Sequence, residues 1–265
     1  MTRPANRLGP AFAALSGRTG LIPFLTAGFP SLDQTLEMAR GLASLGCVAL
    51  ELGIPFSDPI ADGPEIQRAS ERALRNGVTR EAVLDLVREL RRASPVPVVL
   101  MTYANPVLVG GVETFARRAA EAGVDGVIFS DAPPDEAPEL WAAFEDAGID
   151  PVALVAPTTE AARLPMLARR SRGFIYCLAR TGVTGAGAGE SGDLDQRIAA
   201  LRALSRLPLA VGFGISSREA AQRLRGRADA IVVGAALMRA ASLEGGEDAT
   251  RRVLALAGEL AAALA

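Results

Sequence analysis

Two acidic residues occupy positions where a carboxylate could transfer protons. Glu51 lies inside Val48–Leu52, an otherwise apolar run in which an unpaired carboxylate would be costly to bury. Such burial raises the pKa of a carboxyl group and suits it to acid/base catalysis, whereas a structural salt bridge to an arginine is the alternative role. Asp62 follows in a loop that also holds Asp58. Each aspartate precedes proline or glycine, so turn and capping roles are open as well.

The residue types that are missing narrow the chemistry further. The chain contains no histidine and no lysine, so all 28 of its basic residues are arginines. A Ser–His–Asp triad, a histidine base and a lysine Schiff base are therefore excluded. Cys47 and Cys177 lie in apolar runs and are expected to be buried and reduced, which argues against a zinc cluster or a disulfide. No metal site is predicted, although an all-carboxylate magnesium site stays open in principle.

Three glycine-rich stretches in the second half of the chain suit a phosphate group. They are Gly182–Gly185, Gly212–Gly214 and Gly234. Glycine lets backbone N–H groups approach phosphate oxygens closely, and helix N-termini behind such loops attract anions. Together with the carboxylates, these stretches predict a small phosphorylated substrate that undergoes acid/base chemistry.

Short apolar runs alternate with longer amphipathic segments along the chain, as in proteins whose parallel strands are buried on both faces. The eight predicted strands are Leu21–Leu25, Val48–Leu52, Val96–Met101, Gly126–Ser130, Val152–Val155, Gly173–Leu178, Leu209–Phe213 and Ala230–Val233. Eight strand–helix units in 265 residues favour an α/β fold, a single (β/α)8 TIM-barrel domain over residues 1–265. A doubly wound open sheet is the alternative, but no G-x-G-x-x-G follows the first predicted strand.

Capping residues predict where several of the intervening helices begin. Two capping boxes, Ser31–Gln34 and Ser216–Glu219, precede helical segments. Pro64 suits the first turn of an extra helix after the second strand, over about 64–76, and an extra N-terminal helix is expected to cap the barrel floor. Active sites of such barrels lie at the carboxyl ends of the strands. The carboxylates and the glycine-rich loops are therefore predicted to meet there.

Charge and hydropathy exclude several classes of partner. The formal net charge is −2, which gives no electrostatic reason to expect a nucleic acid. No signal peptide is visible in Met1–Pro10. The longest apolar run, near Ala230–Met238, is far shorter than the roughly 20 residues that span a bilayer. We therefore expect a soluble, cytoplasmic protein.

Six motifs, in the same order, resemble those of tryptophan synthase alpha subunits. The most specific is Leu50–Pro64, with the sequence LELGIPFSDPIADGP. The other five are Pro23–Gly28, Met101–Pro106, Ser130–Pro134, Arg180–Gly185 and Val211–Ser216. The resemblance implies a TIM barrel that cleaves indole-3-glycerol phosphate into indole and glyceraldehyde 3-phosphate by a retro-aldol step of tryptophan biosynthesis.

The resemblance also implies roles for individual positions. Glu51 and Asp62 match the family's catalytic carboxylates, and Tyr176 matches a tyrosine beside the glutamate. The positions around indole and glycerol are matched by Phe24, Met101, Tyr103 and Phe213. The phosphate site is matched by Gly185, Gly214, Gly234 and Ala235. Because the family commonly has serine at the last of these, the missing hydroxyl is expected to cost about 1 kcal/mol of phosphate binding.

The implied chemistry fits the missing residue types. Without a lysine or a histidine-bound zinc, the indole ring itself would accept electrons once its C3 atom is protonated. Glu51 would carry protons to C3 and from the glycerol hydroxyl, and Asp62 would stabilise positive charge at the ring nitrogen. No cofactor is expected in this chain. A beta subunit, joined in an α2β2 heterotetramer, would receive the indole and hold pyridoxal phosphate.

Three alternatives are set against this hypothesis. The first is another phosphate-binding barrel lyase or isomerase, such as indole-glycerol-phosphate synthase. That enzyme resembles a barrel with an essential lysine, which is absent here. A non-catalytic subunit that only activates its partner is disfavoured by the presence of both Glu51 and Asp62. A stand-alone lyase that releases indole stays open, because a single sequence does not reveal whether a beta subunit accompanies it.

Overall fold

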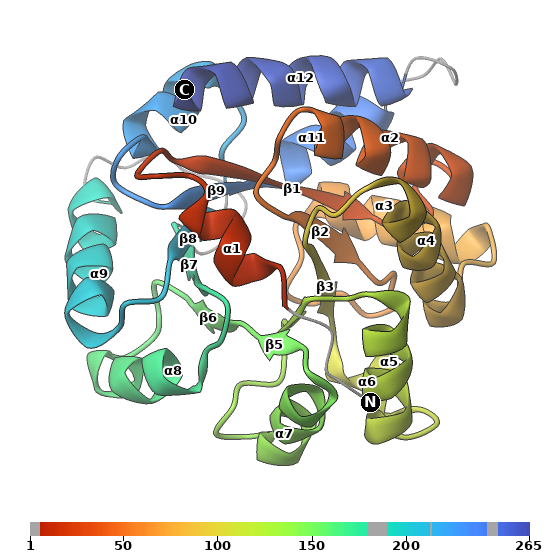
Figure 1. The fold of residues 1–265 in the computed structure, drawn as a ribbon, viewed down its shortest axis with the longest axis horizontal. Coiled ribbons are helices and arrows are strands. Elements are labelled where there is room, and N and C mark those ends of the chain that lie inside the picture. The colour runs from red at the N-terminus through yellow and green to blue at the C-terminus, as the bar shows by residue number, and fades with distance from the viewer. Residues whose placement is uncertain (1–5, 180–189, 213, 243–248) are drawn as a thin grey trace.

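The computed structural model describes residues 6–179, 190–212, 214–242 and 249–265, in which parallel strands form the centre and helices surround them (Figure 1). The strands are β1 (Gly20–Thr26), β2 (Leu50–Gly53), β3 (Val98–Thr102), β4 (Gly126–Phe129), β5 (Asp150–Pro151), β6 (Ala153–Val155), β7 (Ile175–Leu178), β8 (Leu209–Gly212) and β9 (Ala230–Val233). The helices are α1 (Leu8–Ala13), α2 (Leu32–Ser44), α3 (Pro64–Arg75), α4 (Arg80–Ala93), α5 (Ala104–Leu108), α6 (Val112–Ala122), α7 (Pro138–Ala147), α8 (Leu164–Arg170), α9 (Glu190–Leu204), α10 (Arg218–Leu224), α11 (Ala235–Ser242) and α12 (Ala249–Leu264).

The parallel sheet closes into a barrel. Its strand order is β5-β4-β3-β2-β1-β9-β8-β7-β6, so β5 and β6 stand at the two ends. Only Val152 separates them in the chain, and its N–H donates to the carbonyl of Val127 in β4 at 2.8 Å. The two ends of the order are therefore parts of one interrupted strand, and the predicted (β/α)8 barrel is confirmed.

The predicted fifth strand, Val152–Val155, is found in two pieces that bond to different neighbours. β5 pairs with β4 through Asp150 and Pro151, whereas β6 pairs with β7. Pro151 has no N–H to give to a ladder, so the change of partner falls where the chain already lacks a donor. The other seven predicted strands are present, with ends that differ by up to two residues.

The predicted helix starts are mostly confirmed. The Ser31 hydroxyl accepts a hydrogen bond from the Gln34 N–H at 3.2 Å and caps α2. Pro64 stands in the first turn of α3. The second capping box was predicted one residue too early, since Ser217 caps α10 by accepting from the Ala220 N–H at 3.3 Å.

Four helices supplement the repeated strand–helix pattern. The extra N-terminal helix is α1, which lies across the barrel end where the strands begin (Figure 1). Leu8 and Phe12 of α1 pack into the apolar cluster inside the barrel. The extra helix after the second strand is α3, which precedes α4. The sequence did not predict the short helices α5 and α11, which follow β3 and β9.

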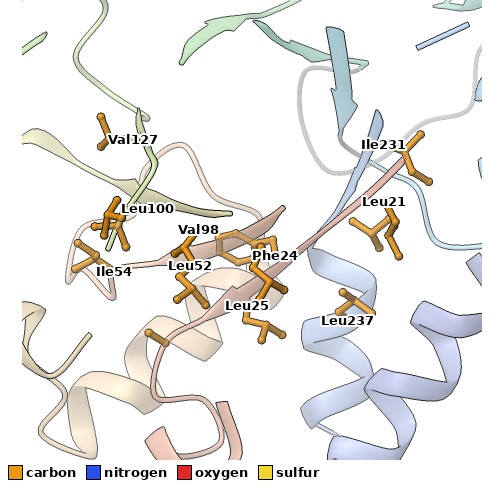
Figure 2. Close-up of a cluster of buried hydrophobic side chains, with 14 of the residues drawn as sticks. Leu21, Phe24, Leu25, Leu52, Ile54, Val98, Leu100, Val127, Ile231 and Leu237 are labelled. Carbon is orange, nitrogen blue, oxygen red and sulfur yellow. The ribbon is translucent and has the colours of Figure 1, made fainter. Parts of the chain in front are cut away.

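Alternate strand residues face the inside of the barrel and the surrounding helices. Ile22, Val99 and Ile128 belong to the inner cluster, while the residues that precede them, Leu21, Val98 and Val127, belong to the outer core. Figure 2 shows part of that outer core, in which Leu21 and Ile231, paired on adjacent strands, lie near Leu237 of α11. Within the described residues, no helix is both long enough and apolar enough to cross a membrane.

Candidate active site

A cavity of about 470 Å³ lies at the carboxyl ends of the strands. Its walls come from the segments 61–66, 214–216 and 234–239. The strand residues that line it are Phe24, Glu51, Met101, Leu154, Tyr176, Leu178 and Val232, and Ser130, just after β4, lines it as well. This is the end of the barrel where sites of parallel barrels are built, and most of the strand-derived floor is apolar.

Glu51 projects from β2 into this cavity and is only 1% exposed. Its Cα atom is paired with that of Phe24 on β1 and that of Val99 on β3. Neither carboxyl oxygen has a hydrogen-bond partner among the described residues, so the predicted alternative of a salt bridge to arginine is not found there. Burial, followed by the negative charge of Asp62, raises the pKa of Glu51 to about 8. Glu51 is therefore an uncharged acid at neutral pH.

Asp62 lines the same cavity from the loop between β2 and α3. Burial raises its pKa to about 6, and a hydrogen bond from the Tyr103 side chain opposes that rise. Gly63 occupies the N-cap position of α3, and α3 has no side-chain cap. Asp62 is thus not the cap of this helix, and its carboxylate, mostly ionised at neutral pH, is directed to the cavity instead.

Tyr103 contacts the loop that carries Asp62 and fixes its position. Its hydroxyl accepts a hydrogen bond from the Ala61 N–H at 3.0 Å and bonds to the carboxylate of Asp62. Its ring packs against Phe56 of the same loop, with 5.1 Å between centroids. Tyr103 lines a small hollow beside the cavity and is not among the residues that line the cavity itself. The structure therefore places it where it positions Asp62.

Tyr176 reaches the cavity from β7 and is 5% exposed. Burial, together with the charges of Glu51 and Asp62, raises its pKa well above the ordinary value, so the hydroxyl keeps its proton. Its ring fits because position 212 is glycine, where a Cβ atom would overlap the tyrosine. Gly53 likewise leaves room for Phe24, since a Cβ there would lie 2.6 Å from the phenyl ring. Both glycines shape the cavity, a role that the sequence analysis did not assign to them.

Three of the predicted phosphate residues line the same cavity, after β8 and β9. Gly214, with a φ of +80°, Gly234 and Ala235 all line the cavity. Ala235 begins α11, so the free N–H groups of the first turn of that helix are available to an anion there. Two predicted residues, Gly185 of the phosphate group and Phe213 of the indole group, lie outside the described residues.

Three polar residues of the cavity were not singled out by the sequence analysis. Ser130 directly follows β4 and has a buried hydroxyl without a partner in the described part of the chain. Arg239 of α11 pairs with Glu65 of α3, with 2.9 Å between Nη2 and Oε1. The spacing of Arg239, four residues after Ala235, places both on one face of α11. That spacing was the only sequence signal that could have indicated Arg239.

Other parts of the described structure offer less chemistry. No group of three or more aspartate, glutamate or cysteine side chains is arranged to hold a metal ion in the described ranges. Both cysteines are free, Cys177 buried and Cys47 half-buried. A second hollow, of about 520 Å³, lies beside α1 at the opposite end of the barrel. It is separate from the cavity at the carboxyl ends of the strands, which Glu51 and Asp62 line.

A sequence model of the tryptophan synthase alpha chain matches residues 12–265, which is nearly the whole protein. The chain belongs to the tryptophan synthase alpha chain family. The motifs that resembled this family are thus confirmed as marks of membership, and the Leu50–Pro64 motif supplies two of the carboxyl groups that line the cavity, Glu51 and Asp62.

Individual members of the tryptophan synthase alpha chain family agree with this assignment along their full length. The alpha chain of Chromobacterium violaceum is 46% identical over 260 residues, covering 98% of this chain and 99% of its own. That of Caulobacter vibrioides is also 46% identical and covers 98% and 96%. The crystal structure of the Legionella pneumophila alpha subunit superposes with a TM-score of 0.89 at 35% identity, covering 98% and 99%.

A similar chain also occurs in crystal structures described as tryptophan synthase. One, from Mycobacterium tuberculosis, has a TM-score of 0.88 at 40% identity and covers 98% of this chain and 99% of that one. The barrel and its added helices are therefore the family's fold.

Proposed function

We propose that the cavity binds indole-3-glycerol phosphate, and that Glu51 and Asp62 carry its cleavage to indole and glyceraldehyde 3-phosphate. This is the lyase reaction of the tryptophan synthase alpha chain family, a step of tryptophan biosynthesis. The observation that supports these roles most directly is the state of Glu51, a buried carboxyl group that has no hydrogen-bond partner among the described residues and shares a ligand-sized cavity with the carboxylate of Asp62.

The substrate's two ends suit the two sides of the cavity. The indole ring is flat and apolar and fits against Phe24, Met101 and Leu154. The phosphate is directed to Gly234 and Ala235 at the start of α11, where backbone N–H groups are free. This orientation leaves the bond to be broken, between indole C3 and the glycerol chain, near the carboxyl group of Glu51.

The acid states of the two carboxyl groups suit the bond cleavage. Protonated Glu51 delivers a proton to indole C3, which converts the ring to an indolenine cation. Ionised Asp62 stabilises the positive charge at the ring N–H. Glu51, now a carboxylate, then takes the proton of the glycerol hydroxyl. The C3–carbon bond breaks, its electrons return to the ring, and the hydroxyl carbon becomes the aldehyde of glyceraldehyde 3-phosphate.

Replacing Glu51 by glutamine tests these roles. Glutamine matches the size of glutamate but transfers no proton, so indole release should fall by about 10²–10⁴-fold. Binding of glycerol phosphate should be nearly unchanged, because the phosphate end does not contact residue 51 in the proposed orientation. Glu71→Gln is a matched control on the exposed face of α3 and should keep wild-type turnover. If Glu51→Gln keeps more than about a tenth of wild-type turnover, Glu51 is not the proton carrier.

We further propose that a beta subunit docks on the rim of this cavity in an α2β2 assembly. Three large apolar side chains are exposed there: Ile60 is 84% exposed, Leu108 55% and Val109 62%. Their segments lie together, because Tyr103, which precedes α5, contacts both Ala61 and Phe56. Crystal structures described as tryptophan synthase, rather than as its alpha subunit alone, contain similar chains. The partner would supply the pyridoxal phosphate that this lysine-free chain cannot bind as a Schiff base.

A further inference from the structure

The charges around the cavity are poorly matched to a phosphate ester, with one exception. Three of the described residues that line it are carboxylic acids, namely Glu51, Asp62 and Glu65. Arg239 is the single basic side chain in that lining. A phosphate monoester carries a charge of about −1.5 to −2 at neutral pH and would be repelled by the two ionised acids, Asp62 and Glu65. Whatever cationic attraction the described lining offers therefore comes from Arg239.

The position of Arg239 on α11 directs it towards the start of that helix. Residues four apart share a helix face, and long helical side chains lean back towards the N-terminus. Arg239 and Ala235 therefore share one face of α11, and the arginine side chain leans towards the first turn of the helix. Both residues line the cavity. Arg239 and the first turn of α11, whose free N–H groups are proposed to hold the phosphate, therefore border the same cavity.

Glu65 holds the guanidinium group without using all of its hydrogen-bond capacity. Nη2 of Arg239 lies 2.9 Å from Oε1 of Glu65, and the arginine side chain is still 58% exposed. A guanidinium group has five N–H donors in a planar fork, which suits a second anionic partner. An ion pair as exposed as this one contributes little to stability, so a change of geometry on ligand binding costs little.

We propose that Arg239 binds the phosphate group of the substrate and selects for the phosphorylated ligand, and that Glu65 holds the arginine at the edge of the empty cavity. This inference rests on the proposed function, because it takes the start of α11 as the phosphate end. The rival role is purely structural: the Glu65–Arg239 pair would only tie α3 to α11, which pack against each other.

Calorimetry on the full-length chain separates the two roles, with glycerol 3-phosphate and indole as probes. Arg239→Gln should weaken glycerol 3-phosphate binding by about ten-fold or more, the effect of a lost charge-assisted hydrogen bond, and should leave indole binding unchanged. In turnover, the KM should rise while kcat is largely kept, as for a group that binds substrate and transition state alike.

Two further variants serve as controls. Glu65→Gln frees Arg239 and removes a nearby negative charge, so glycerol 3-phosphate should bind as tightly as in the wild type or more tightly. Arg68→Gln removes another arginine that faces Glu65, at 3.8 Å, but Arg68 does not line the cavity, so neither probe should bind differently. If Arg239→Gln and Glu65→Gln weaken the binding of glycerol 3-phosphate and of indole equally, the proposal is overturned. The ion pair would then only link α3 to α11.

An additional variant distinguishes this inference from the proposed function. Ala235→Asp places a negative charge at the start of α11, where it suits the helix but repels a phosphate. If Ala235→Asp leaves glycerol 3-phosphate binding unchanged, the proposed phosphate end itself is wrong. If it abolishes binding while Arg239→Gln has no effect, the phosphate end stands and only the role of Arg239 is refuted.

Discussion

Asp62 and Glu51 face the same cavity, and the charge of Asp62 adds to burial in raising the pKa of Glu51 to about 8. Asp62 itself is less buried and is hydrogen bonded to Tyr103, and its pKa rises only to about 6. Environments that separate the pKa values of two carboxyl groups in this way allow one group to stay protonated while the other is ionised. Near neutral pH, the pair therefore holds the proton on Glu51 and the charge on Asp62.

The first prediction concerns the pH dependence of turnover. The proposed mechanism needs ionised Asp62 and protonated Glu51, so kcat/KM for indole-3-glycerol phosphate should rise as pH passes about 6 and fall as it passes about 8. The expected profile is bell-shaped, with its maximum between these values. The measurement is indole release across this range at constant ionic strength.

A variant of Asp62 identifies the alkaline limb of that profile. In Asp62→Asn the charge that helps to raise the pKa of Glu51 is gone, so the remaining activity should fall off at a lower pH than in the wild type. Burial, the larger cause, persists, and the limb should stay well above the ordinary range of a glutamate. An alkaline limb at an unchanged pH would mean that it does not report Glu51.

The second prediction concerns stability. The folded-state pKa of Glu51 is raised from 4.5 to about 8, so folding favours its protonated form. That contribution is fully present below pH 4.5 and is lost as pH rises through about 8, because burying the charged form is costly. The free energy of unfolding of Glu51→Gln should therefore increase relative to that of the wild type between about pH 4.5 and about pH 9. The increase is on the order of a few kcal/mol.

Urea unfolding at the two ends of that pH range measures this difference. Glu71→Gln is the matched change at an exposed position, and its stability relative to the wild type should not increase at alkaline pH. A constant difference between Glu51→Gln and the wild type at both pH values would show that Glu51 is not buried with a raised pKa.

The third prediction concerns Tyr103, whose hydroxyl lowers the pKa of Asp62 by hydrogen bonding to it. Tyr103→Phe removes that bond, so the pKa of Asp62 should rise and the acidic limb of the pH profile should move to higher pH. The loop should also lose the bond from the Ala61 N–H, and turnover at neutral pH should fall. A drop in turnover with no displacement of the acidic limb would show that Tyr103 only packs in the site and does not lower the pKa of Asp62.

The fold could be predicted from the sequence because a parallel barrel produces a simple alternation of short apolar runs and amphipathic segments. Strands buried on both faces are continuous apolar runs, and each of the eight predicted runs overlaps an observed strand. Their ends were less certain because hydrogen bonds from distant residues set them. The Val48 N–H, for example, bonds to the Leu21 carbonyl although β2 begins at Leu50. The helices α5 and α11 are too short for their apolar periodicity to be recognised.

The site was accessible only in part. Glu51 was detectable because a carboxylate in an apolar run is costly, and the structure gives it no partner among the described residues. Tyr103 was predicted to contact the substrate. Its position just beyond β3 places it in the small hollow beside the cavity, where it contacts Asp62. Arg239 could not be distinguished from the other arginines, because only the packing of α11 against α3 brings it to the cavity.

The fourth prediction tests the alanine that stands where the family commonly has serine. Ala235→Ser adds a hydroxyl at the start of α11, within the cavity lining. If that position contacts the phosphate, glycerol 3-phosphate should bind about five-fold more tightly, the effect of roughly 1 kcal/mol for one hydrogen bond, while indole binding stays the same. Calorimetry with both ligands measures this, and an unchanged affinity for glycerol 3-phosphate would place the phosphate elsewhere.

The fifth prediction concerns the exposed rim formed by Ile60, Leu108 and Val109. Apolar side chains this exposed contribute little to the fold, so replacing Ile60 by aspartate should leave the stability of the isolated chain nearly unchanged. If a beta subunit covers the rim, burying that aspartate would be costly, and the affinity between the subunits should fall by about ten-fold or more. The Asp62 segment is part of the same loop, and docking there should order it and accelerate indole release.

The test is to measure indole release by the purified wild-type chain, alone and with a beta subunit, and to repeat it with Ile60→Asp. Leu45→Asp is the matched control, since Leu45 is 43% exposed but follows α2 at the opposite end of the barrel. We expect slow release by the chain alone, faster release in the complex, loss of that gain in Ile60→Asp, and its retention in Leu45→Asp. Full activity of the isolated chain, with no change when the partner is added, would favour the stand-alone lyase. A gain that survives Ile60→Asp would instead move the docking surface away from this rim.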